Sequence, residues 1–373
     1  MLSLLFKPKR RKAVLALMKA AKAAGMSVEE YTKTLTPEQL AAFLPPDKSE
    51  PKVKMPDVAL WGLPPDDQVT AEKFIADLRV AEAVEAARSE AWQPAAALLA
   101  EIGTDWDRRA AVVLELADAA AHDDGWLKAW QRARPGDPDA AVVNAQGLVH
   151  LAWQIRTSYA AEKVSREQWQ SFFRVLEDAE AASGAAAKLA PEDPTPWRTM
   201  LTVARGRQYE NDRFRAVWAE LVARDPVHRS GHDQALQYWC EKWFGSHELM
   251  FAFAEEAAAK SPRLAVLELV AAHEAVFGDD AEHRAAWQSE RVGRALDRLL
   301  PWLDGEGRDH PSTRTDRAYA AKALVEQGRC DEAVEQFRHL GVHADANVWA
   351  YSGRARVEFR KTRYLACHGA TRP

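Results

Sequence analysis

A polar residue placed directly before proline recurs at regular distances in the middle of the chain. The four dipeptides are Asp137-Pro138, Asp193-Pro194, Asp225-Pro226 and Ser261-Pro262. Each precedes a stretch in which apolar residues recur with helical periodicity, an order that is typical of a helix start. The Asp or Ser side chain can cap free backbone N–H groups, and proline suits the first helical position because it has no N–H to leave unsatisfied. The dipeptides therefore predict four helix starts.

The spacing of these helix starts predicts the architecture. Successive dipeptides are 56, 32 and 36 residues apart. The last two intervals each fit two helices and a turn, and the first fits such a pair with an insertion at residues 157–184. One helical pair cannot bury both of its apolar sides alone, so neighbouring pairs must stack. We therefore predict an all-α array of antiparallel helical hairpins over residues 70–360.

Composition supports helices and argues against a sheet. Alanine, which has the highest helix propensity, fills runs such as AEAVEAARSEA and AFAEEAAAK, and long alternating runs of Val, Ile and Thr are absent. Hydrophobic residues make up 47% of the chain and charged residues 28%, as in a well-buried globular protein. The 14 tryptophans are spread from Trp61 to Trp349. We interpret them as large packing residues of an extended core.

The segment AYAAKALVEQGRCDEAVEQFRHL, at residues 318–340, carries the pattern of a known repeat. Its packing residues are Ala321, Leu324, Gly328, Ala333, Phe337 and Leu340. They stand where the tetratricopeptide-repeat superfamily has its small and large packing residues, and the segment resembles that superfamily. Arg317 departs from the pattern, because this position is usually aromatic or aliphatic, and no proline follows Leu340. The runs DPTPW and QYWCEKW are similar to those of uncharacterised bacterial helical-repeat proteins. The resemblance implies a tetratricopeptide-like solenoid and no activity.

The two ends of the chain differ from its middle in charge. Residues 1–28 carry seven basic side chains and no acid, and residues 353–373 carry six basic side chains and one acid. The remaining residues, 29–352, carry 37 basic and 54 acidic side chains, a net charge of −17. We predict a basic N-terminal helical module at 1–44, a proline-rich linker at 45–69 and a basic tail at 361–373. An acidic body argues against a reader of duplex nucleic acid, whose binding face must neutralise phosphates.

The cysteines and the start of the chain indicate a cytoplasmic protein. The three cysteines are far apart and form no CxxC pair, so a disulfide framework is not expected. In MLSLLFKPKRRK the short apolar run precedes the charges, which is the wrong order for a secretory signal. No segment approaches the roughly 20 apolar residues that a transmembrane helix needs.

The stretch GHDQALQYWCEKWFGSHELM, at 231–250, gathers the residue types that could carry chemistry. Ala235, Leu236, Trp239 and Trp243 recur at helical spacing and predict one apolar face. Gly245 is expected to end this helix, and Ser246 to cap the next one. The simplest interpretation is a packed helical hairpin.

Catalysis in this stretch would require Cys240 and His247 to approach across the turn. His247-Glu248 and His273-Glu274 begin like the HExxH motif of zinc proteases, but Phe251 and Phe277 replace the second histidine. No third metal ligand has suitable spacing. The chain also lacks phosphate-binding, dinucleotide-binding and nucleophile-elbow motifs. We therefore expect no enzyme, no metal and no cofactor.

The expected function is binding of a protein or peptide, whose identity the sequence leaves open, in the groove of the array. The candidate contact residues are Gln234, Gln237, Tyr238 and Glu241, with His232 and Arg198 as weaker candidates. An acidic body favours a basic or mixed-charge partner. Two alternatives stay open. One is an enzyme with a Cys240/His247 centre between hairpins, and the other is an adaptor that touches a membrane or nucleic-acid surface through its basic ends.

Overall fold

A computed structural model describes residues 20–21, 24, 26, 31, 56–75, 77–156, 164–275, 285–350 and 353–371. The chain divides into two compact units, residues 1–55 and residues 56–373. In the first unit only five residues are described, and Ala21 among them is buried in a helical turn. The N-terminal helical module predicted for residues 1–44 therefore lies almost entirely outside the described residues.

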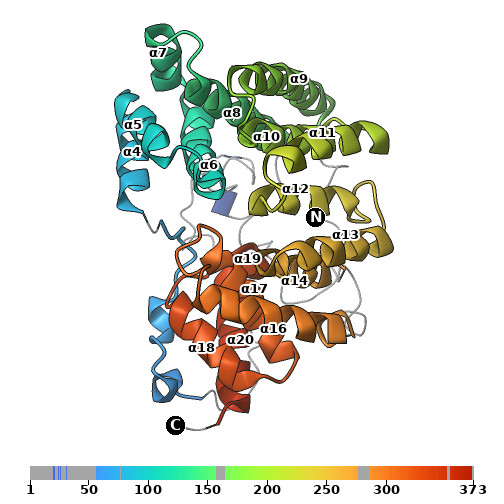
Figure 1. The fold of residues 1–373 in the computed structure, drawn as a ribbon. Helices are drawn as coiled ribbons and strands as arrows, with labels where there is room; N and C mark the ends of the chain where they lie inside the picture. The colour runs from blue at the N-terminus through green and yellow to red at the C-terminus, as the bar shows by residue number, and fades with distance from the viewer. Residues whose placement is uncertain are drawn as a thin grey trace. The chain divides into compact units, whose positions relative to one another are not determined.

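The second unit is built of α-helices (Figure 1). In chain order they are α4 (Leu78–Arg88), α5 (Gln93–Ile102), α6 (Trp106–His122), α7 (Gly125–Ala133), α8 (Pro138–Arg156), α9 (Arg166–Leu189), α10 (Thr195–Gly206), α11 (Asn211–Arg224), α12 (Arg229–Trp239), α13 (His247–Lys260), α14 (Val266–Glu274), α16 (Glu290–Asp304), α17 (Thr313–Glu326), α18 (Cys330–Leu340), α19 (Asn347–Ala350) and α20 (Ala355–Gly369). Short 3₁₀ helices are η2 (Val58–Trp61), η3 (Asp66–Gln68) and η5 (Pro262–Leu264). The described part contains no β-strand, and its single β-bridge joins Thr70 and His343.

The helices stack as an array. Consecutive helices pack as pairs, as in α4 with α5, α8 with α9, α10 with α11, and α17 with α18. Helices two positions apart in the chain also pack on each other, as in α4 with α6, α6 with α8, α8 with α10, and α10 with α12. A helix that contacts both its partner and the next layer buries two sides, which is how stacked hairpins build a continuous core. The prediction of an all-α helical array is confirmed.

The core consists of three apolar clusters along the unit. The first lies among α4 to α8, the second among α8 to α12, and the third mainly among α13 to α20. Four tryptophans are among the largest fully buried side chains: Trp126, Trp130, Trp287 and Trp349. Each cluster thus has aromatic residues between alanine-rich helices, as the spread of tryptophans along the sequence predicted.

Two of the four predicted helix starts are capped as expected. The Asp137 carboxylate accepts from the backbone N–H of Asp139, 2.9 Å away, at the start of α8. The Asp193 carboxylate accepts from the N–H of Thr195 at 2.7 Å, at the start of α10. The other two dipeptides lie in turns before their helices. Asp225-Pro226 precedes α12, which His228 caps instead, and Ser261-Pro262 leads into η5.

Residues 56–69, which were predicted as part of a linker, are packed against the C-terminal helices. Val58, Trp61 and Leu63 are buried in the third core cluster. The Trp61 indole Nε1 donates to the carbonyl of Thr371 over 3.3 Å. The proline-rich composition obscured three large apolar side chains, and their burial fixes this segment in place.

The C-terminal segment also differs from the predicted basic tail. It forms α20, in which Arg363 is fully buried and donates to the carbonyl of Pro64 at 3.0 Å. The same guanidinium pairs with Asp66, and Arg360 lies 3.3 Å from the other oxygen of that carboxylate. Part of the positive charge at this end is therefore compensated inside the fold.

A short backbone contact joins the beginning of the array to its end. The N–H of Thr70 donates to the carbonyl of Val342 at 2.9 Å, and the N–H of Ala344 donates to the carbonyl of Thr70 at 2.7 Å. This contact brings residues near both ends of the array together, and some of them line one half-open cavity with residues from its middle.

Candidate functional site

The candidate site is a half-open cavity of about 1080 Å³ in the second unit. Its walls come from residues 73–75 and 77–80, from the first half of α6, from α10 and α12, and from residues 308–315 and 317. Pockets of roughly 300–1,000 Å³ hold drug-sized ligands, so this cavity is large enough for a small molecule or a short peptide segment. Its polar wall is organised by buried charges.

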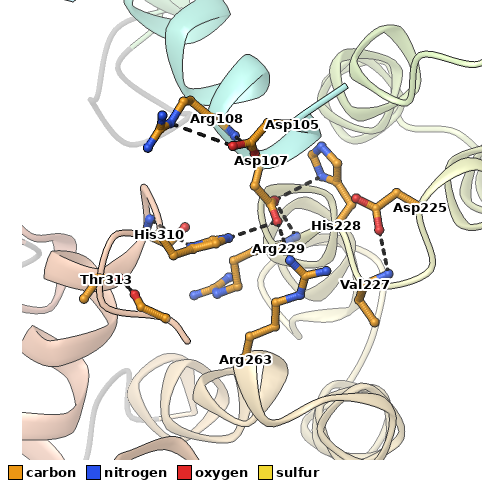
Figure 2. A network of polar contacts seen from close by, with 12 residues as sticks. Asp105, Asp107, Arg108, Asp225, Val227, His228, Arg229, Arg263, His310 and Thr313 are labelled. Carbon is orange, nitrogen blue, oxygen red and sulfur yellow. Dashed lines mark hydrogen bonds and ion pairs between the residues drawn. The ribbon is translucent and has the colours of Figure 1, made fainter. Parts of the chain in front are cut away.

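Asp107, in the first turn of α6, is the centre of a polar network that joins three parts of the array (Figure 2). Its Oδ1 accepts from the backbone N–H of Arg229 at 2.9 Å. Its Oδ2 lies 3.0 Å from both Arg263 Nη1 and His310 Nε2. The first N–H groups of a helix have no partner within that helix, so the Asp107 carboxylate supplies one for α12.

The surroundings of Asp107 keep it ionised. Burial alone would raise the pKa of this carboxyl, which is 7% exposed as a residue. The hydrogen bond from His310 and the charges of His228, His310 and Arg263 outweigh burial and lower the pKa from 3.8 to about 2. Asp107 is therefore a fixed negative charge at neutral pH.

The two histidines of the network act as structural groups. His310 Nε2 faces Asp107, and its Nδ1 accepts from the backbone N–H of Ser312 at 3.2 Å. His228 caps α12 because its Nδ1 accepts from the N–H of Gly231 at 3.0 Å. Burial lowers the pKa of His228, against the opposing charge of Asp107. With both ring nitrogens of His310 occupied, this histidine has no free nitrogen to serve as a general base.

A buried ion pair ties α12 to α17. Arg229 is fully buried, and its Nη2 lies 2.8 Å from Oδ1 of Asp316, which is also fully buried. Arg229 pairs with Asp233 one turn further along α12 as well. Burial raises the pKa of Asp316, and the charge of Arg229 opposes this rise. Each charge depends on the other, because an unpaired charge at such a site is costly.

A second buried ion cluster joins α6 to α8 and to the start of α10. Arg109 Nε lies 2.7 Å from Asp193 Oδ2, and Arg109 Nη2 lies 2.6 Å from Asp139 Oδ1. The other oxygen of Asp193 caps α10. The polar wall of the cavity thus rests on ion pairs that hold α6, α8, α10, α12 and α17 together.

Two of the six predicted contact residues line the cavity. Arg198, on α10, donates from Nε to Ser230 Oγ at 2.9 Å and from Nη1 to Gln146 Oε1 at 2.8 Å. Gln234, on α12, accepts from the Thr202 hydroxyl at 3.1 Å. Burial, aided by the charge of Arg205, lowers the pKa of Arg198 to about 10, so Arg198 still carries its charge at neutral pH.

The other four predicted contact residues lie away from this cavity. Tyr238 and His232 are fully buried, so their predicted place on an open groove is wrong. The Tyr238 hydroxyl donates to the carbonyl of Tyr209 at 2.6 Å, and His232 Nδ1 bonds the carbonyl of His228 at 2.9 Å. Gln237 donates to Glu274 at 2.7 Å, and Glu241 is exposed near His247. A helix inside an array is covered on two sides, which leaves less free surface than one apolar face suggested.

The turn at residues 240–245 brings Cys240 and His247 to one small cavity of about 280 Å³. The Cys240 Sγ lies 3.4 Å from the carbonyl of Leu236 and 3.3 Å from Met250 Sδ. Burial and the charge of Glu274 raise the pKa of this thiol to about 12. His247 Nε2 pairs with Glu241 at 3.2 Å. A thiol with a raised pKa holds little thiolate, the form that attacks a substrate.

The helix before this turn is shorter than predicted. α12 ends at Trp239, and Trp243 lies in the turn, with its ring 6.0 Å from that of Trp153. The helical spacing of Trp239 and Trp243 therefore did not place them on one helix. The predicted helix end at Gly245 is wrong by six residues, whereas the cap at Ser246 is confirmed, since Ser246 Oγ accepts from the N–H of Leu249 at 3.2 Å.

The described residues show no group of three or more His, Cys, Asp or Glu side chains placed to hold a metal ion. Within the same part of the chain, every helix is too short or too polar to cross a membrane.

Sequence reasoning missed the residues that organise the cavity, chiefly Asp107, Arg229 and Asp316. One signal was present next to them. Arg317 departs from the repeat pattern, and it is buried on the cavity wall, where it donates to Gln336 Oε1 at 2.6 Å and to the carbonyl of Leu303 at 2.7 Å. A charged residue at a repeat position that is usually apolar was therefore the one sequence signal of the polar cavity wall.

Comparison with known proteins finds one family model that matches a segment contributing to this site. No curated protein and no solved structure matches the chain. The matching segment begins at the buried Val69 and ends at Gly206, the last residue of α10, so it includes Asp107, Arg109 and Arg198. Over these residues, 69–206, the chain matches the model of the family described as "Domain of unknown function (DUF4034)".

Proposed function

We propose that the protein is a binding protein that holds a segment of another protein in the cavity formed by its helical array. The observation that carries this proposal is the half-open cavity of about 1080 Å³, whose lining combines charged and apolar side chains. Phe74 and Leu78 line it and are 38% and 73% exposed, so they offer apolar contact area. Buried ion pairs fix the wall, and a preorganised site loses little entropy when a ligand binds.

Two observations favour this function over the alternatives. The Cys240 thiol is buried with a raised pKa, which is the opposite of what an activated nucleophile needs. Arg360 and Arg363 are engaged with Asp66, which reduces the charge that the C-terminal end could offer to an anionic surface. A binding role uses the cavity and requires neither an activated thiol nor a free basic C-terminal end.

A random peptide library displayed on phage tests this proposal with the full-length protein as bait. Ala111 lines the cavity on α6, so Ala111→Trp should obstruct it without removing a described polar contact. Ala181 is exposed on α9 and outside the cavity wall, so Ala181→Trp is the matched control. Selected peptides should bind the native protein and the control, and fail to bind Ala111→Trp. Peptides that bind all three proteins equally, or no enrichment at all, would contradict the proposal.

A further inference from the structure

The residues that line the cavity carry a net positive charge, whereas the chain as a whole is acidic. Its lining includes eight Lys or Arg side chains and six Asp or Glu side chains. Residues 29–352, which contain the whole lining, carry 37 basic and 54 acidic side chains. The arginines and lysines are therefore concentrated at the cavity in an otherwise acidic body. A partner that enters it meets a surplus of positive charge.

Most of the cavity carboxylates are already neutralised. Four of them form ion pairs: Asp77 with Arg79, Asp107 with Arg263, Glu115 with Lys73, and Asp233 with Arg229. Three arginines of the lining form no ion pair with a described carboxylate: Arg198, Arg308 and Arg314. Arg308 and Arg314 bond the carbonyls of Asp304 and Leu340, at 2.6 and 2.9 Å. Two lining carboxylates, Asp309 and Asp345, are also outside these ion pairs, so the surplus of positive charge is small and belongs to guanidinium groups.

Arg198 is the most preorganised of the three. It is 6% exposed, and two of its nitrogens are held by the neutral acceptors Ser230 and Gln146. Gln146 is fixed in turn, because its Oε1 also accepts from the Thr199 hydroxyl at 2.9 Å. No described residue accepts a hydrogen bond from Arg198 Nη2. A buried guanidinium that is hydrogen-bonded only to neutral acceptors is unfavourable, and a ligand carboxylate in direct contact would relieve this cost.

Arg314 adds an apolar neighbour to this charge. Its guanidinium lies 4.1 Å from the centre of the Phe74 ring, and Leu78 is exposed nearby on the same wall. A ligand that combines carboxylates with apolar side chains fits both features.

We propose that the occupant of the cavity is an acidic peptide segment, and that Arg198 is the residue that selects for it by binding an Asp or Glu carboxylate. This inference rests on the proposed binding function and names the chemical class of its partner. It replaces the basic or mixed-charge partner that the acidic composition favoured. The net charge of a whole chain does not describe the wall of its cavity, where the partner would lie.

Fluorescence anisotropy with three labelled peptides of equal length tests the class of ligand. The peptides alternate leucine with glutamate, glutamine or lysine, and each is titrated with the full-length protein. The glutamate peptide should bind about tenfold or more tightly than the glutamine peptide, and its affinity should fall with salt. Equal binding of the three peptides, lost in Ala111→Trp, would overturn the acidic class and leave the binding function standing. If none of the three peptides binds and the phage selection gives no enrichment, both the acidic ligand class and the binding function are contradicted.

Variants of the arginines test the selecting residue. Arg198→Gln keeps hydrogen-bonding capacity but removes the charge, and it should weaken binding of the glutamate peptide about tenfold. Arg314→Gln, whose described polar contact is to a carbonyl, should weaken it several-fold and covers the case in which Arg198→Gln does not fold. Arg132→Gln, at an exposed position of α7 outside the cavity, is the control. Unchanged glutamate-peptide binding in both cavity variants, or tighter binding of single-stranded dT12 than of that peptide, would overturn the proposal.

Discussion

The two ends of α12 differ in what the sequence shows and in what the structure does with it. The N-terminal end, at residues 228–233, holds buried polar groups that contact Asp107 and Asp316. The C-terminal end, with Cys240 and His247 beyond it, gathers the reactive residue types that draw attention in the sequence. There the thiol is buried, and the imidazole pairs with a surface glutamate. Cys240 and His247, which are close together in sequence, lie at a packed turn. The charged residues that organise the cavity wall are far apart in sequence.

The largest effect should follow from separating the buried pair at the N-terminal end. Asp316→Asn leaves the Arg229 charge buried with only the partly exposed Asp233 as a partner. Breaking a buried pair costs about 3–5 kcal/mol, and we expect a loss in this range. Urea unfolding followed by circular dichroism measures it. A loss below about 1 kcal/mol would show that the pair does not hold α12 to α17.

The second prediction uses pH to sharpen the comparison. The pKa of Asp107 is lowered from 3.8 to about 2 in the folded protein. A lowered carboxyl pKa stabilises the fold above pH 3.8, and this stabilisation is lost as the pH falls toward 2. The difference in unfolding free energy between the native protein and Asp107→Asn should therefore shrink by about 2 kcal/mol between pH 6 and pH 2. A difference that stays constant over this range would contradict the role of Asp107.

A smaller effect is expected at the C-terminal end. Cys240→Ala should cost about 1 kcal/mol, the loss of a group of about methyl size from a core, and should leave peptide binding unchanged. In the native protein, iodoacetamide should modify the partly exposed Cys330 before Cys240, which should react only after denaturant is added. Mass spectrometry of the labelled peptides gives the order. Faster labelling of Cys240 would favour the enzyme alternative.

The smallest effect is expected at Glu241, whose side chain is 71% exposed in its ion pair with His247. Exposed ion pairs contribute about 0–1 kcal/mol to stability. Glu241→Ala should therefore change the urea midpoint by no more than the error of the measurement. A loss comparable with that of Asp316→Asn would erase the distinction between the two ends of α12.

The helices were predictable because their signals are local. The Asp137 and Asp193 caps and the cap at Ser246 depend on residues within a few positions of each other. Such signals can also mislead by a turn, as at Asp225-Pro226, where the helix begins later with His228 as its cap. The all-α array follows from these local patterns and from the spacing of the helix starts.

The cavity was not predictable because its contacts are not local. Asp107 and His310 are 203 residues apart, and Arg229 and Asp316 are 87 apart. Periodicity indicates which face of a helix is covered, but it does not say which helix covers it, and a buried charge looks like a surface charge in the sequence. Arg317 was the exception, because a repeat pattern assigned its position to the core.

A crystal structure of the protein with its tightest-binding selected peptide tests the central claim most directly. We predict that the peptide lies inside the cavity, with a carboxylate oxygen within hydrogen-bonding distance of Arg198 and an apolar side chain against Phe74. A peptide bound on the outer face of the array, with the cavity unoccupied, would contradict the account.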